Sequence, residues 1–149
     1  MVTGMKLHAL LYPAWAILFV PSAAWLILLR IFLTGGLVLA LALRHYDIPN
    51  KAQIWKRSIL RVWLFAFLAH CLGAMLAFGL YAFLMPVGFP WEQLTMLPGA
   101  AFAGMMLYLF HSCGSFRRCE LTQEQVHKLS LALALFTAPY TMLLPTAPF

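Results

Sequence analysis

The chain has few charged residues. Only 9% of its 149 residues are Asp, Glu, Lys or Arg, whereas soluble proteins carry about 25%. A soluble fold of this length would leave much of its 64% hydrophobic content in water, at a cost of about 25 cal/mol per Å² of apolar surface. The scarcity of charge therefore excludes an ordinary soluble domain and predicts an integral membrane protein.

Acids are especially scarce, and none of the four falls deep within a long apolar stretch. They are Asp47, Glu92, Glu120 and Glu124. A proton- or cation-coupled carrier normally needs carboxylates within the membrane, and acid–base catalysis needs a positioned acid and base. The sequence therefore disfavours both classes without excluding an enzyme, and it indicates no cofactor.

The three cysteines form no C-x-x-C pair, so neither a disulfide framework nor a specific zinc motif is indicated. One loosely spaced set of His and Cys residues, which are side chains that zinc accepts, lies within residues 111–127. Its spacing lacks the tight cysteine pair of structural zinc sites, so we expect no metal and keep the set only as a weak candidate. The set is His111, Cys113, Cys119 and His127.

Positive charge is concentrated in two places. Eight of the ten Lys and Arg residues lie within residues 44–61 and 117–128. This clustering is typical of cytoplasmic loops beside anionic lipid and not of a nucleic-acid-binding face. We therefore expect a bacterial inner-membrane protein whose basic loops are cytoplasmic, with anionic lipid headgroups as partners and no nucleic acid. The candidate docking residues are Arg44, Lys56, Arg57, Arg61, Arg117 and Arg118.

The apolar runs predict an all-α, polytopic transmembrane helix bundle that forms one domain over residues 1–149. A full span needs about 20 residues, so four full spans are predicted. Pro21 breaks the first apolar run, and the residues before it are predicted to form a short re-entrant or interfacial helix. A five-pass arrangement with two short, tilted helices stays open. The predicted ranges are about 7–20 for the short helix and 22–43, 54–85, 94–111 and 122–147 for the spans.

Small residues recur at four-residue spacing in two of these spans. This spacing lets helices approach closely in lipid. It predicts packing faces that serve either contacts within the chain or an interface between chains. The residues are Ala69, Gly73 and Ala77 in the second full span, and Gly99, Ala103 and Gly104 in the third.

Arg30 and His70 lie deep within predicted spans. An ionised guanidinium near the bilayer centre costs at least about 2.5 kcal/mol, so Arg30 either snorkels or pairs structurally, or it binds a ligand or a conducted solute. His70 either bonds a carbonyl of a neighbouring helix or lines one path with Arg30. Together with Glu92 from the opposite loop, they are the candidate ligand or conduction residues.

Two functions fit these features. The first is an oligomeric channel or carrier for a small anionic or neutral polar solute, because so few helices enclose little space unless identical chains assemble. The second is a non-catalytic membrane subunit or anchor, which docks a cytoplasmic partner or anionic lipid through its basic inner loops.

Overall fold

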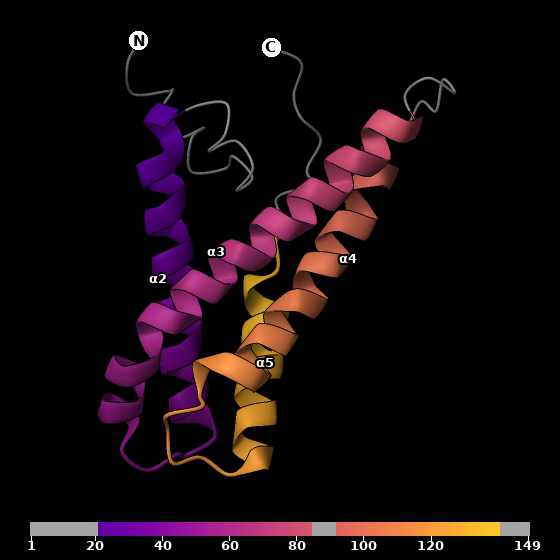
Figure 1. Cartoon of the computed structure of the whole chain (residues 1–149). Coiled ribbons are helices and arrows are strands. Elements are labelled where there is room, and N and C mark those ends of the chain that lie inside the picture. The colour runs from indigo at the N-terminus through magenta and orange to yellow at the C-terminus, as the bar shows by residue number, and fades with distance from the viewer. Residues whose placement is uncertain (1–20, 85–91, 141–149) are drawn as a thin grey trace.

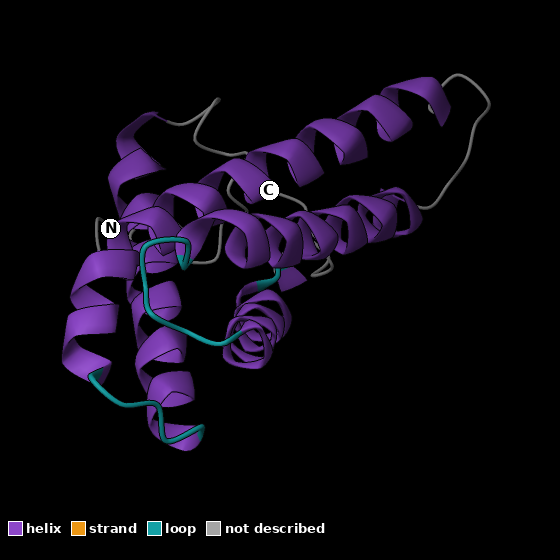
Figure 2. Cartoon of the chain, turned by 60° about the horizontal axis from the view of Figure 1, so that its bottom comes forward, coloured by secondary structure: helices purple, strands orange, loops and turns teal. Residues whose placement is uncertain are grey.

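The computed structural model describes residues 21–84 and 92–140. This part of the chain is helical and contains no strand (Figure 2). The predicted helix at 7–20 lies outside the described residues. The alternative of five passes depends on the same residues. The described elements are α2 (Pro21–His45), α3 (Lys51–Leu84), α4 (Glu92–Phe110), the π-helix η3 (His111–Ser115) and α5 (Gln123–Thr137).

Three of these helical stretches are long and apolar enough to cross a membrane. They are Trp25–His45, Lys51–Leu84 and Met96–Ser115. The fourth helix, α5, has 15 residues and rises about 22 Å at 1.5 Å per residue. A hydrocarbon core is about 30 Å thick, so α5 is too short to span it alone.

The prediction that the last helix continues to residue 147 is wrong, because α5 ends at Thr137. Ala138 has an extended ψ of 147°, the conformation favoured directly before a proline. Pro139 has no N–H to donate to the carbonyl of Leu135. The hydroxyl of Tyr140 donates to that carbonyl instead. A side chain thus satisfies a backbone acceptor at the end of the helix.

The start of α5 agrees with the sequence prediction. The Thr122 side chain accepts a hydrogen bond from the backbone N–H of Gln125 at 3.3 Å. The Gln125 side chain accepts one from the backbone N–H of Thr122 at 3.0 Å. These reciprocal bonds form a capping box, which satisfies two backbone donors that the helix itself leaves free.

Figure 1 shows that α3 and α4 lie side by side and are tilted relative to α2 and α5. The turn 46–50 and the loop 116–122 lie at one end of the molecule, while the last residues of α3 and the first residues of α4 lie at the other. Both basic segments therefore meet at a single end, which we call the basic end. Asp47 and Asn50 have φ of 48° and 56° in the turn, a conformation that Asp and Asn tolerate.

Two tryptophans of α3 form hydrogen bonds to the backbone of α2. The indole N–H of Trp55 donates to the carbonyl of Gly36, and that of Trp63 donates to the carbonyl of Leu28, each at 3.1 Å. A buried indole usually finds such a partner. The two bonds lie two turns of α3 apart, so they fix the position of one helix along the other.

The α3–α4 contact is the most extensive in the bundle, and it is built on small residues. A Cβ added to Gly73 would lie 2.6 Å from both the Cβ of Ala103 and the carbonyl oxygen of Gly99. A Cβ added to Gly99 would lie 2.6 Å from the Cβ of Ala77. The faces predicted from four-residue spacing therefore meet each other within one chain.

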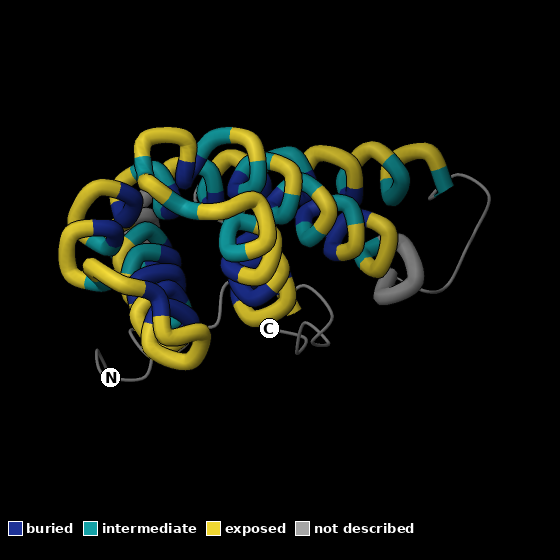
Figure 3. The backbone as a smooth tube through the Cα atoms, turned by 90° about the horizontal axis from the view of Figure 1, so that it is seen from below, coloured by how far each residue is buried: buried dark blue, intermediate teal, exposed yellow. Residues whose placement is uncertain are grey.

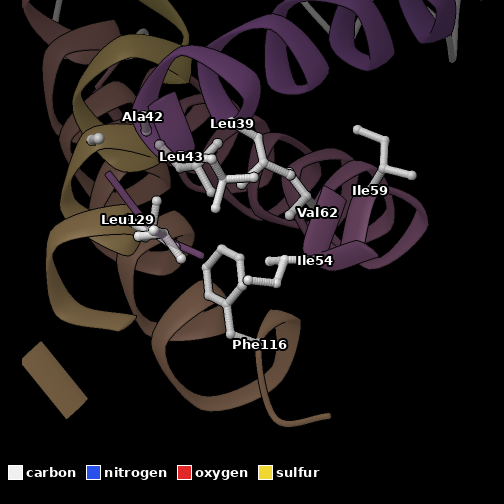
Figure 4. Close-up of a cluster of buried hydrophobic side chains, with 11 residues drawn as sticks. Leu39, Ala42, Leu43, Ile54, Ile59, Val62, Phe116 and Leu129 are labelled. Carbon is white, nitrogen blue, oxygen red and sulfur yellow. The ribbon is translucent and has the colours of Figure 1, made fainter. Parts of the chain in front are cut away.

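An apolar core fills the bundle near the basic end. Phe116, which follows η3, is 2% exposed and inserts between side chains of α2, α3 and α5 (Figure 4).

Buried residues lie on the inward faces of the helices and exposed ones on the outward faces (Figure 3). The outward faces carry large apolar side chains, which is expected where lipid is the solvent. They include Leu33, Leu37, Leu60, Leu64, Met75, Leu109, Leu131 and Phe136.

Candidate functional site

Arg30 lies in the middle of α2 and is partly buried. Its backbone carbonyl accepts a hydrogen bond from Thr34 Oγ1 at 2.8 Å. Its guanidinium is close enough to His70 on α3 for the two groups to interact electrostatically. Because a guanidinium does not lose its charge in proteins, Arg30 brings a permanent positive charge to the side of the bundle that holds His70.

His70 lies on α3 and is 4% exposed. Its Nδ1 lies 2.6 Å from the carbonyl oxygen of Ala66. A carbonyl oxygen only accepts, so Nδ1 carries the proton and donates. The ring also interacts with the backbone carbonyl of Thr137 at the end of α5. The hydrogen bond of His70 to Ala66 is therefore made within its own helix, α3, and the choice between a structural role and a path shared with Arg30 stays a prediction.

His111 is a second histidine of the interior. It is fully buried, and its charge would interact with that of His70. Its Nδ1 lies 2.8 Å from the hydroxyl of Ser115, which is fully buried as well. Its Nε2 has no hydrogen-bond partner within the described residues, and the same holds for Ser130 Oγ. Leaving such an atom unpaired costs about 1–3 kcal/mol.

The π-helix η3 gives His111 and Ser115 their arrangement. Turns of this kind are rare and often occur at functional sites. Gly114 lets η3 approach α3, because a Cβ there would lie 2.6 Å from Cε2 of Phe65. The sequence therefore has a glycine at a position where the π-helix η3 contacts the Phe65 ring.

Sequence reasoning missed the burial of His111, which it assigned to the basic loop. The signal was present in the spacing of Ala103, Leu107, His111 and Ser115. These residues recur every four positions, and each of them is fully buried. The buried face of α4 that holds Ala103 and Leu107 thus continues into the polar residues His111 and Ser115 of η3.

The weak metal candidate is not assembled. Within residues 21–84 and 92–140, no group of three or more His, Cys, Asp or Glu side chains could hold a metal ion. His127 is exposed, and its Nδ1 lies 2.7 Å from the hydroxyl of Tyr108. Because His111 is buried and Cys113 is exposed, the proposed ligands do not share one environment. Cys119 belongs to the loop beyond η3.

Glu92 is the first residue of α4, and its side chain lies outside the part of the chain that the structure describes. Its suggested pairing with Arg30 therefore stays a prediction.

The basic end brings arginines together from segments far apart in the sequence. Burial raises the pKa of the Cys119 thiol, and the charges of Arg61 and Arg57 oppose that rise. Both α3 arginines therefore lie near Cys119, which follows Arg117 and Arg118 directly in the chain. Apart from the partly buried Arg61, these arginines are exposed.

Two of the three acids at this end, Asp47 and Glu124 but not Glu120, form ion pairs with a lysine of the same segment. Lys51 Nζ donates to Asp47 Oδ1 at 2.8 Å, and this bond with the lysine charge lowers the pKa of the Asp47 carboxyl. Glu124 forms the equivalent pair with Lys128. Six further cations at this end form no ion pair with another described residue, so positive charge remains uncompensated. They are Arg44, Lys56, Arg57, Arg61, Arg117 and Arg118.

A shallow apolar groove of about 390 Å³ lies between α4 and α5. Gly104, predicted as a packing residue, lines this groove rather than the α3 contact: a Cβ there would lie 3.9 Å from the Cβ of Ala138. The groove faces outward with the apolar surface of the bundle, so lipid is its expected solvent.

No protein-family model, curated protein sequence or solved structure matches this chain.

Proposed function

We propose that the protein is a non-catalytic membrane subunit or anchor whose basic end binds anionic groups. Anionic lipid headgroups are the first candidates, and an acidic surface of a cytoplasmic partner is the second. The observation that carries the proposal is that the turn 46–50 and the loop 116–122 lie at one end of the bundle (Figure 1), where Arg57 and Arg61 act on Cys119. Each cation near an anionic membrane surface contributes about 1 kcal/mol.

The packing of the small residues favours this function over an oligomeric channel. The channel hypothesis requires several chains, and its best contact faces were those around Gly73 and Gly99. Both faces are occupied within the chain by the α3–α4 contact. A single bundle of this size encloses little space, so a pore would require several chains. The small-residue faces that would have joined these chains are already used within one chain.

The proposal includes a position in the membrane. We propose a bacterial inner membrane with the basic end in the cytosol, because basic loops are retained on that side. We also propose that α5 is embedded beside the three longer helices as a short fourth membrane helix. Its exposed Leu131, Leu135 and Phe136 support this, since they would otherwise face water.

The test compares two double variants at the same end of the bundle. Arg57→Gln with Arg118→Gln removes cations that have no acidic partner among the described residues. Lys51→Gln with Lys128→Gln removes two cations that are already paired. We expect the first variant to bind phosphatidylglycerol about 30-fold more weakly, at about 1 kcal/mol per cation.

The second variant should change phosphatidylglycerol binding much less. Native mass spectrometry of the detergent-solubilised protein, titrated with phosphatidylglycerol or phosphatidylcholine, measures both effects. Equal losses in the two variants, or no preference of the wild type for the anionic lipid, would contradict the proposal.

A carrier-like role for a small anionic or neutral polar solute is the second candidate, favoured by the proximity of Arg30 and His70. We expect Arg30→Leu to abolish solute flux into reconstituted vesicles while the folded protein still inserts. Arg44→Leu, at the basic end, serves as the control. Unchanged flux in Arg30→Leu would remove this role.

A further inference from the structure

The groove between α4 and α5 runs along the outside of the bundle. Its lining residues extend from Leu97 to Tyr108 on α4, and from Leu131 to Tyr140 on and just after α5. On α4 this range rises about 16 Å at 1.5 Å per residue. Half of the lining residues are small, which leaves room between the two helices. These small residues are Ala100, Ala101, Gly104, Ala134 and Ala138.

The groove has the dimensions of one lipid acyl chain. Its volume of about 390 Å³ lies within the range of about 300–1,000 Å³ of small-molecule sites. An extended polypeptide advances about 3.5 Å over the three backbone bonds of a residue, or about 1.2 Å per bond. At the same advance, a carbon chain covers 16 Å in about 13 bonds. None of the lining residues is charged, as an acyl chain requires.

A helix from a second copy of the chain fits the groove less well. A helix is about 10 Å across with its side chains, so 16 Å of helix occupies roughly 1,200 Å³. This is about three times the volume of the groove. The groove is therefore narrow enough for a single hydrocarbon chain to fill it.

The groove is polar where it approaches the basic end. There the hydroxyl of Tyr108 lies 2.7 Å from Nδ1 of His127, and the two rings pack edge to face with centroids 5.6 Å apart. His127 precedes Leu131 by four residues, so it lies on the same face of α5, one turn closer to the basic end. At the opposite end of the groove, the hydroxyl of Tyr140 is used by the carbonyl of Leu135.

The Tyr108–His127 pair has one donor more than its mutual bond uses. A tyrosine has one O–H and a neutral imidazole has one N–H. Whichever of the two donates within the pair, the other donor remains for a ligand. A phosphodiester is ionised and offers only acceptor oxygens, and hydrogen bonds to ionised groups are the stronger kind. A lipid phosphate therefore complements this pair.

The charge at this end favours an anionic headgroup. Glu124 lies near His127 on α5, but its carboxylate is paired with Lys128. The loop 116–122, which leads into α5, holds Arg117 and Arg118 against one acid, Glu120. The net charge beside the polar end of the groove is therefore positive.

We propose that the α4–α5 groove is a binding site for one anionic phospholipid molecule. One acyl chain lies along the groove, and the lipid phosphate accepts a hydrogen bond from the Tyr108–His127 pair. The inference rests on the proposed function, since it gives an anionic lipid of the basic end a defined site. It also adds a requirement, because cations alone select the charge of a headgroup, whereas the groove also selects the length of the acyl chain.

The first test fills the groove. Native mass spectrometry of the detergent-solubilised full-length protein compares phosphatidylglycerol with long acyl chains and the dihexanoyl form. We expect the wild type to bind the long-chain lipid more tightly and Gly104→Leu to weaken that binding about tenfold, because the excluded methylenes lose their protein contacts. Gly79→Leu is the matched control, since Gly79 faces open space on α3, and it should behave as wild type.

The second test removes the polar pair. Tyr108→Phe with His127→Leu deletes both donors and keeps the side chains similar in size. We expect phosphatidylglycerol binding to weaken about tenfold or more, as for the loss of a hydrogen bond to a charged group. His45→Leu with Tyr46→Phe is the control, because it changes another contacting His–Tyr pair at the basic end. This control should retain wild-type binding.

A measurement on the wild-type chain avoids any dependence on variant folding. Phosphatidylglycerol with a diazirine in its acyl chain is photolysed on the protein, and the labelled peptides are mapped. We expect the label to concentrate on the groove residues of α4 and α5 rather than on the outward face of α2, which carries Leu33 and Leu37.

The outcomes separate this inference from the proposed function. Even labelling of all outward faces, equal effects of Gly104→Leu and Gly79→Leu, or a dimer that Gly104→Leu dissociates would overturn the groove site. The basic end could still prefer phosphatidylglycerol over phosphatidylcholine in each of these cases. Loss of that preference in the wild type, with chain-length selection retained, would instead contradict the proposed function and the anionic part of this inference.

Discussion

At the scale of single residues, glycine decides how closely the helices of this bundle approach. Gly73 and Gly99 each face the backbone of the other's helix, and a Cβ on either would lie 2.6–2.7 Å from a carbonyl oxygen of the partner. Gly79 lies on the same helix as Gly73 but faces open space, since a Cβ added there would meet no atom within 4 Å. Gly79 therefore has room for a side chain, whereas Gly73 on the same helix does not.

Gly73→Ala tests this contrast directly. Because backbone rather than a flexible side chain blocks the added methyl, we expect a loss of about 1–3 kcal/mol in unfolding free energy. Gly79→Ala should be neutral or stabilising by up to about 1 kcal/mol, since alanine is the better helix former. Circular dichroism during sodium dodecyl sulfate titration of mixed micelles measures both. Similar destabilisation by the two substitutions would contradict the packing account.

Residue spacing revealed some of these features and hid others. The four-residue recurrence of small residues located the α3–α4 contact, because in lipid a close approach requires small side chains. The same spacing led from Ala103 and Leu107 to His111, but the adjacent cluster of cysteines and arginines suggested a loop. Which ring nitrogen of His111 lacks a partner depends on tertiary contacts, and spacing alone does not contain them.

At the scale of elements, α2 is positioned by hydrogen bonds as well as by apolar packing. The indoles of Trp55 and Trp63 reach backbone carbonyls of α2. Those carbonyls belong to a helix and already have partners, so the indoles add second bonds to them. Their effect is to fix which turn of α3 lies beside which turn of α2.

Trp63→Phe should test this element contact. The phenyl ring keeps most of the apolar contact and loses the N–H, so we expect a loss of about 0.5–1.5 kcal/mol in unfolding free energy. Trp25→Phe is the control, because Trp25 is 80% exposed and should leave stability nearly unchanged. The same micelle titration applies, and equal effects of the two substitutions would show that the Trp63 bond does not fix the helices.

Element boundaries were only partly predictable. The apolar runs located the long helices, and the capping box located the start of α5. The end of α5 was predicted ten residues too late, because the apolar composition continues past Pro139. The extended conformation of Ala138 and the closure by Tyr140 depend on local backbone geometry, which average hydrophobicity does not report.

At the scale of the whole molecule, the separation of charge along the bundle is the organising feature. The turn 46–50 and the loop 116–122 lie at one end (Figure 1), and the segments around them, residues 44–61 and 117–128, hold eight of the ten Lys and Arg residues. The outward faces in between are apolar. This distribution is the one expected of a molecule whose ends meet water and whose sides meet lipid.

Site-directed accessibility tests this arrangement most directly. With the three native cysteines changed to serine, Glu120→Cys places one thiol at the basic end, and Ala82→Cys places one near the far end of α3. A membrane-impermeant maleimide is applied to inside-out and right-side-out vesicles. We predict that Glu120→Cys reacts only in inside-out vesicles and Ala82→Cys only in right-side-out ones. Reaction of both from the same side would contradict the transmembrane arrangement on which the account depends.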